Sequence, residues 1–244
     1  MDTVAENLAI KTADGTMTGF AFHPADDQPH PTVIVIQEIF GVDNHIKDVA
    51  RRFAAEGYYA VAPDLFYRKG DALTVPYEDR EEAFRLRATT TPEGITADLN
   101  AVISHLKGES GANERIGIVG YCFGGGVVYM ASHAVAGIQA AAIYYGGGIV
   151  PRDDAPAGTP SGLDQASKVA CPVIGFWGED DAGIPPAHVN RIEEALKGAG
   201  KDVEFQIYKG AGHGFFCDDR GSYNKEASED AWPRTLTFFG KHLS

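Results

Sequence analysis

The chain has 244 residues, of which 44% are hydrophobic and 23% charged, a composition that suits one α/β domain with a substantial buried core. Acidic residues outnumber basic ones by 34 to 21, and no run is rich in Lys or Arg, which disfavours binding to nucleic acid or to an anionic membrane. The opening residues lack the pattern of a secretion leader, and no stretch approaches the roughly eighteen apolar residues of a membrane span. We therefore expect a cytoplasmic protein.

Apolar runs bounded by turn residues alternate along the chain with segments of helical period. Strands are expected at 15–24, 32–38, 58–66, 115–120, 139–147, 171–178 and 203–208. Helices are expected at 43–57, 77–88, 91–107, 123–135, 186–200 and 225–243, the last interrupted near Pro233. The segment 151–164 is rich in Pro, Gly and Asp and is predicted to be a surface loop. This alternation predicts a single domain over residues 1–244, with a mostly parallel sheet covered by helices on both faces.

The stretch "GIVGYCFGGGVV" places Cys122 at the turn between a buried strand and a helix. Gly120, Cys122 and Gly124 form a G-x-C-x-G elbow, in which small flanking residues permit a tight turn and leave the central side chain exposed. The N-terminus of the following helix favours the reactive thiolate. The pattern therefore predicts a nucleophile, against the alternative of a buried structural cysteine.

A nucleophilic cysteine needs a base, and the base needs an orienting group. His213 follows the strand 203–208 and has glycine on both sides, which leaves room for its ring to approach the elbow. Asp180 and Asp181 follow the strand that ends near residue 177, so either one is a candidate acid. The resulting order of nucleophile, acid and histidine is that of α/β hydrolases. The alternative for His213 is a solvated loop histidine.

Six segments carry a resemblance to a known family: "VIQEIFGV", "APDLF", "VGYCFGG", "YYGG", "GEDDAGIP" and "GAGHGFF". In order and spacing they resemble the dienelactone hydrolase family, over almost the whole chain. The resemblance implies a single-domain α/β-hydrolase fold and a triad of Cys122, Asp181 and His213. It favours Asp181 because the family's acid lies four residues before a proline, here Pro185, and Asp180 stays open as the alternative.

The resemblance also gives a role to Glu38, which the residues alone would make a solvated charge at a strand end. In the family this glutamate meets the nucleophilic thiol. A carboxylate beside sulfur disfavours a second negative charge, so it would keep the resting cysteine protonated. The backbone amides of Phe123, directly after the nucleophile, and of Ile39 are the expected oxyanion hole.

Arg80 aligns with a family arginine that binds the substrate carboxylate, although its charge pattern alone favours a surface residue paired with Glu81 or Glu82. Some family members carry a second arginine four residues after the histidine, where this chain has Cys217. Arg220 is near in sequence and cannot be assumed to substitute. Tyr145 is expected to line the pocket.

These features together predict a hydrolase of a small carboxylic ester or lactone, with a covalent acyl-cysteine intermediate and no metal or organic cofactor. The sequence makes no prediction of an oligomeric state. One alternative is a catalytically weak family member that acts as a ligand-binding protein. Another is a short-chain dehydrogenase, because "GYCFGGG" also matches G-x-x-x-G-x-G, but that cofactor loop should follow the first strand of the sheet.

Overall fold

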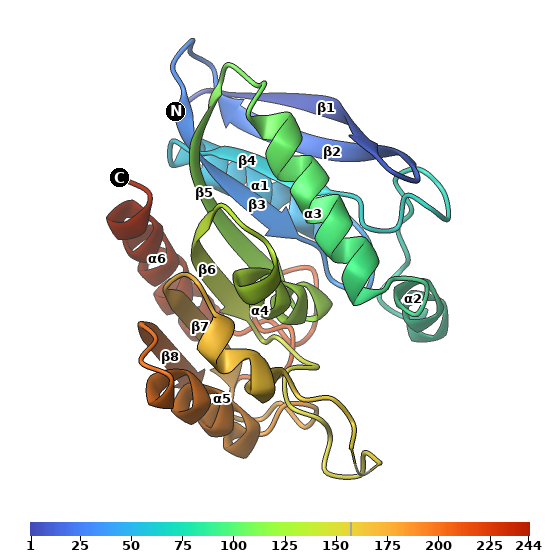
Figure 1. The fold of residues 1–244 in the computed structure, drawn as a ribbon, viewed down its shortest axis with the longest axis vertical. Helices are drawn as coiled ribbons and strands as arrows, with labels where there is room; N and C mark the ends of the chain where they lie inside the picture. Colours follow the sequence, from blue (N-terminus) through green and yellow to red (C-terminus); the bar gives the residue numbers. More distant parts are fainter. Residues whose placement is uncertain (157) are drawn as a thin grey trace.

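The centre of the structure, a computed structural model that describes residues 1–156 and 158–244, is an eight-stranded sheet. The strands lie in the order β1-β2-β4-β3-β5-β6-β7-β8, and β2 is antiparallel to both of its neighbours while the others pair in parallel (Figure 1). The strands are β1 Thr3–Thr12, β2 Gly15–Pro24, β3 His30–Ile36, β4 Tyr59–Pro63, β5 Ala112–Tyr121, β6 Ile138–Tyr144, β7 Val173–Gly178 and β8 Val203–Tyr208.

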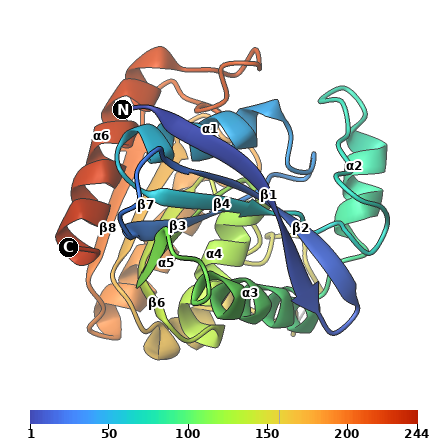
Figure 2. The same ribbon diagram turned by 90° about the horizontal axis from the view of Figure 1, so that it is seen from above.

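Helices cover both faces of this sheet. Figure 2 shows α1 and α6 on one face and α3, α4 and α5 on the other, with α2 standing apart at one end. The helices are α1 Asn44–Ala55, α2 Arg80–Arg87, α3 Pro92–Leu106, α4 Phe123–Ala134, the 3-10 helix η1 Gly162–Lys168, α5 Pro186–Gly198 and α6 Lys225–His242. The predicted α/β-hydrolase architecture is confirmed.

The buried side chains form two hydrophobic clusters. The main core fills both sides of the sheet, and in it the ring of Phe53 on α1 packs 4.6 Å from Trp232 and 5.9 Å from Phe239 on α6. A smaller cluster lies beneath α2 and contains Ile39, Phe40, Phe66, Val75, Ala83 and Leu86. This smaller cluster therefore holds α2 against the chain segment that follows β3.

Three expectations differ from the structure. The strand β1 was not predicted, because only Leu8 and Ile10 of its ten residues are buried and the apolar alternation is short. β3 ends at Ile36, so Glu38 lies just beyond the strand. α6 continues through Pro233 without interruption, because this proline is exposed and water can hydrate the carbonyl that loses its amide donor.

Local sequence explains the positions of the helix ends. The Asp43 side chain accepts a hydrogen bond from the amide of Ile46 at 3.0 Å and so caps α1. The predicted surface loop after β6 contains one regular element, η1, which begins where the Ser161 side chain accepts the amide of Leu163. Within the described residues, no helix is both long enough and apolar enough to cross a membrane.

Candidate active site

Cys122 lies between β5 and α4, at the turn where the strand passes into the helix. Its backbone has φ 55° and ψ −114°, a conformation that costs a residue with a Cβ about 1–3 kcal/mol. A Cβ on Gly120 would collide with the carbonyl of Gly124, and a Cβ on Gly124 would lie 2.5 Å from the carbonyl oxygen of Ile36. Both glycines are thus needed for α4 to begin so close to the strand ends, and they hold the partly exposed thiol in a strained turn.

His213 and Asp181 come from the loops after β8 and β7. His213 Nδ1 lies 2.6 Å from Asp181 Oδ2. The other carboxylate oxygen of Asp181, which is 3% exposed, accepts the amides of Gly183 at 2.9 Å and Ile184 at 3.1 Å. Asp180, the open alternative, is exposed. The structure therefore brings Asp181 against the histidine and leaves Asp180 facing solvent.

The charges around His213 shift its protonation strongly. Burial by itself would lower the pKa of His213, but the hydrogen bond with Asp181 and the contact with Cys122 raise this pKa to about 10. Burial by itself would raise the pKa of Asp181. The hydrogen bond with His213, the charge of His213 and the two backbone amides outweigh burial, so the pKa of Asp181 lies below its usual value. The pKa of His213 is therefore set by the two groups on either side of its ring, Asp181 and Cys122.

Glu38 is fully buried and pairs with an arginine 182 residues further along the chain. Arg220 donates from one guanidinium nitrogen to both carboxylate oxygens of Glu38, at 3.2 and 3.5 Å, and its guanidinium lies 5.4 Å from the ring centroids of Phe40 and Tyr77. Burial would lower the pKa of Arg220, whereas Glu38 and nearby groups that include Cys122 raise it. In the described part of the chain, no hydrogen bond or ion pair joins Glu38 to Cys122.

The backbone amides of Phe123 and Ile39 belong to two chain segments that touch. Gly124, next to Phe123, packs so closely on the turn after β3 that a Cβ would lie 2.6 Å from the carbonyl oxygen of Gln37. Neither amide donates a hydrogen bond to another group in residues 1–156 or 158–244. The side chains of Phe123 and Ile39 both pack in the cluster beneath α2. Two unpaired amide donors thus lie beside the elbow.

Tyr145 follows β6 in a left-handed conformation with φ 37°. Its buried ring lies 5.2 Å from the ring of His213, edge to face, and its hydroxyl has no hydrogen-bond partner among the described residues. Burial, with the charge of Glu38, raises the pKa of Tyr145 well above its ordinary value, so the phenol keeps its proton. The tyrosine predicted to line the pocket therefore packs directly on the ring of His213.

The structure places Arg80 at the surface and Cys217 in the interior. Arg80 is the first residue of α2, is exposed, and makes no side-chain hydrogen bond or ion pair within the described chain. Cys217 is fully buried, with its sulfur 3.5 Å from the hydroxyl of Tyr77, which donates to Asp43 at 2.8 Å. The arginine that the fold brings to Glu38 is Arg220. Its only sequence signal was its proximity to the histidine.

A known protein family covers nearly the whole chain. The sequence profile of the dienelactone hydrolase family matches residues 17–243. The chain belongs to the dienelactone hydrolase family. The resemblance drawn from the six segments is thus confirmed, and this dienelactone hydrolase family member is a carboxylic ester hydrolase.

Relatives of the dienelactone hydrolase family cover nearly all of the chain. A protein of Methylorubrum extorquens, provisionally named carboxymethylenebutenolidase, is 36% identical over 242 residues, which are 98% of this chain and 81% of that protein. A Synechocystis protein of the same provisional name is 36% identical over 97% of this chain and 96% of its own length. The crystal structure of a protein from Klebsiella pneumoniae, provisionally named dienelactone hydrolase, aligns with a TM-score of 0.89 at 33% identity, over 99% of this chain and 100% of that one.

Proposed function

We propose that this enzyme cleaves small carboxylic esters and lactones through an acyl-cysteine intermediate on Cys122. His213 is the acid and base, and Asp181 orients its ring. The observation that carries the proposal is the 2.6 Å contact between His213 Nδ1 and Asp181 Oδ2, because it leaves the other ring nitrogen for the thiol and the leaving group. The exposure of Cys122 at a strained elbow supports the same assignment.

In the acylation step the Cys122 thiolate attacks the carbonyl carbon of the substrate. The amides of Phe123 and Ile39 donate to the oxyanion that forms, a contribution of the kind that lowers a barrier by about 3–4 kcal/mol per donor. His213, as the imidazolium, gives its proton to the leaving oxygen. The carbon–oxygen bond then breaks, the alcohol departs, and the acyl group is left on sulfur as a thioester.

In the deacylation step His213 acts as a base, because the acylated sulfur no longer carries the negative charge that raised the pKa of His213. Contact with Cys122 is one of the influences that raise the pKa of His213, and a thioester sulfur carries no negative charge. The neutral imidazole, still oriented by Asp181, takes a proton from water, and the hydroxide attacks the thioester. The carbon–sulfur bond breaks, the carboxylic acid product leaves, and Cys122 and His213 are free for the next substrate.

Charged groups beside the nucleophile support recognition of an acidic substrate. The name carboxymethylenebutenolidase, carried by the relatives, denotes a lactone that bears a carboxylate. We assign the carboxylate contact to Arg220, whose single-nitrogen pairing with Glu38 leaves other guanidinium donors unused, and we keep Arg80 as a second candidate at the rim. Glu38 limits thiolate formation until that pair is disturbed, and Tyr145 forms one wall of the pocket.

The deciding experiment traps the intermediate. p-Nitrophenyl acetate should give a burst of nitrophenol and an acetyl mass increase on Cys122, and Cys122→Ala should fold normally, lose the burst and lose hydrolysis. Cys171→Ala and Cys217→Ala are the matched controls and should keep most of the activity. Equal losses in all three variants, or ester that binds without being cleaved by the wild-type protein, would rule out the assignment.

A further inference from the structure

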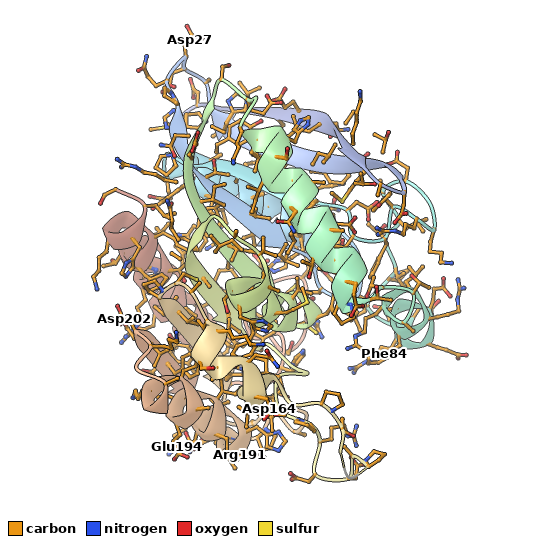
Figure 3. The ribbon with its side chains drawn as sticks, in the orientation of Figure 1. Asp27, Phe84, Asp164, Arg191, Glu194 and Asp202 are labelled. Carbon is orange, nitrogen blue, oxygen red and sulfur yellow. The ribbon has the colours of Figure 1, made fainter. Side chains whose placement is uncertain are left out.

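A cavity of about 530 Å³ runs along α4, and its lining includes Phe123, the residue directly after Cys122. Its walls are the turn between α2 and α3, the helix α4, the loop after β6 and the start of η1. In Figure 3, the labels Phe84 and Asp164 locate α2 and η1, and neither of these two residues lines the cavity. Its apolar lining includes Ile95, Phe123, Val127, Met130 and Ile149. This volume and lining are typical of a small-molecule site.

The charge of the cavity is opposite to that of the whole protein. The net charge of the chain is −13, yet none of the lining residues is acidic, and Asp164 is exposed and outside the lining. Arg87 is the charged lining residue: its guanidinium lies 5.7 Å from the ring centroid of Phe123 and forms no ion pair in the part of the chain that the structure describes. Burial lowers the pKa of His133, a further lining residue, and keeps it neutral. A free cation thus lies at the end of the cavity nearest the elbow.

The position of the proton donor indicates which part of a substrate enters the cavity. In the reaction proposed above, on which this inference rests, His213 protonates the leaving oxygen, so the alcohol portion lies beside His213. The cavity lining includes neither His213 nor Asp181 nor Tyr145, and it begins at Phe123, the residue that supplies an oxyanion donor. The cavity therefore extends from the carbonyl on the side opposite the leaving group.

We infer that this cavity is the acyl-binding subsite and that it takes extended apolar acyl groups that carry a carboxylate, which Arg87 binds. The apolar lining excludes water from an alkyl or aryl chain laid along α4. The guanidinium, already over the Phe123 ring, meets the carboxylate at the end of the cavity nearest the elbow. Such a substrate is larger than a compact lactone and is selected by its acid portion.

Chain length tests the apolar part of the subsite. With p-nitrophenyl acetate, butyrate, hexanoate and octanoate, wild-type kcat/KM should rise by about two- to fourfold per methylene until the cavity is full. Met130→Trp should abolish this rise, so that kcat/KM no longer increases from acetate to octanoate. Gln165→Trp, on the opposite wall, gives a second obstruction if Met130→Trp fails to fold, and Asn100→Trp on the exposed surface of α3 is the control for a bulky substitution.

Other outcomes of the same series overturn the inference. A wild-type rate independent of acyl length, or a Met130→Trp variant that slows acetate and hexanoate equally, would show that the acyl group does not enter the cavity. A Met130→Trp variant that discriminates against hexyl acetate and not against the hexanoate ester would make the cavity a leaving-group site. Failure of the covalent mechanism can be told apart from failure of the cavity assignment. In that case Cys122→Ala would still hydrolyse the acetate ester.

Paired arginine substitutions test the anionic part. Arg87→Gln should lower kcat/KM for aryl monoesters of succinic and glutaric acids by roughly tenfold and leave the butyrate ester unchanged. Arg85→Gln is the matched control, because Arg85 lies two residues away on the same helix, outside the cavity lining, and is paired with Glu82. Equal losses in both variants would show surface attraction of the substrate and no specific contact.

Discussion

Two buried carboxylates of this enzyme are paired with arginine, and the pairs differ in how completely they are bonded. Asp98 on α3 accepts two parallel hydrogen bonds from Arg68, at 2.7 and 2.9 Å, and a third from Tyr67 at 3.1 Å. Glu38 meets only one nitrogen of Arg220, at 3.2 and 3.5 Å. Both side chains are 1% exposed. The same residue types thus form a saturated pair far from the nucleophile and an unsaturated pair beside it.

The difference indicates which charges serve the fold and which serve the reaction. A carboxylate with three donors has little acceptor capacity left, and removal of its partner leaves a buried charge that the folded state cannot tolerate. A loosely bonded carboxylate keeps free acceptor sites and responds when a nearby charge changes. Substitutions in the Arg68–Asp98 region should therefore change stability, and substitutions around Cys122 should change chemistry.

The largest expected effect is on the catalytic rate, at the residue that contacts His213. Asp181→Asn should lower kcat by about 10⁴, because the amide no longer fixes the ring orientation of His213 or stabilises its cation. Asp180→Asn, its exposed neighbour, should be mild. Steady-state kinetics of purified, folded variants give the ranking. If Asp180→Asn is the more damaging of the two, the orienting role belongs to Asp180.

The next largest effect is on stability, at the Arg68–Asp98 pair. Arg68→Gln should lower the free energy of unfolding by about 3–5 kcal/mol, because Asp98 stays buried without its partner. The specific activity of the protein that remains folded should be unchanged. Urea denaturation measures the loss, with Arg51→Gln, which removes the exposed pair with Asp48, as a control that should cost less than about 1 kcal/mol. A similar loss in both variants would mean that bonding of Asp98 is not what stabilises this region.

The pH dependence of stability tests the catalytic charges. Because the pKa of His213 is raised to about 10 in the folded state, its contribution to stability is fully present below pH 6.5 and is lost as the pH rises through 10. The stability difference between the wild type and His213→Gln should therefore shrink over this window. Urea denaturation at several pH values measures it. A difference that is constant from pH 6.5 to 10 would contradict a strongly raised pKa.

The smallest effect concerns the unsaturated pair itself. Glu38→Gln removes a negative charge near the thiol and should speed alkylation of Cys122 by a small neutral reagent near neutral pH, by roughly tenfold at most. Arg220→Gln leaves the Glu38 charge uncompensated and should slow it. Opposite directions in the two variants would support a pair that controls the nucleophile. Unchanged rates in both would show that the pair does not affect the thiol.

Much of the site could be anticipated because its signals are local. The elbow needs glycine at 120 because a Cβ there would meet the nearby carbonyl of Gly124, so the pattern reveals Cys122 directly, although glycine at 124 is required by the distant backbone of Ile36 and Gln37. Asp181 and His213 lie after strands, and parallel strands place such residues at one edge of the sheet. The family resemblance already favoured Asp181 over Asp180, and the structure agrees, since only Asp181 turns inward to contact His213.

The partners of Glu38 and the cavity along α4 could not be anticipated in the same way. Arg220 reaches Glu38 because the loop after His213 folds back, with Gly214 at φ 76° and the amide of Asn224 bonded to the carbonyl of Phe215. No periodicity in the sequence encodes that return. The cavity likewise depends on the position of α2, which supplies Arg87 to the lining. The buried residues of α2 pack in a separate cluster, and Phe84 on the same helix is 51% exposed.

The sequence by itself determined the strand and helix alternation, the strained turn at Cys122 and the chemical types available at the strand ends. These follow from apolar periodicity and backbone sterics, which act between residues close in the chain. Tertiary structure alone decided that Asp181 contacts His213, that Arg220 pairs with Glu38, and that Arg87 lies at a cavity while Arg80 is exposed without a partner. Those outcomes depend on distances between segments far apart in sequence, and such distances are set by the order of strands in the sheet and by the packing of the loops that leave it.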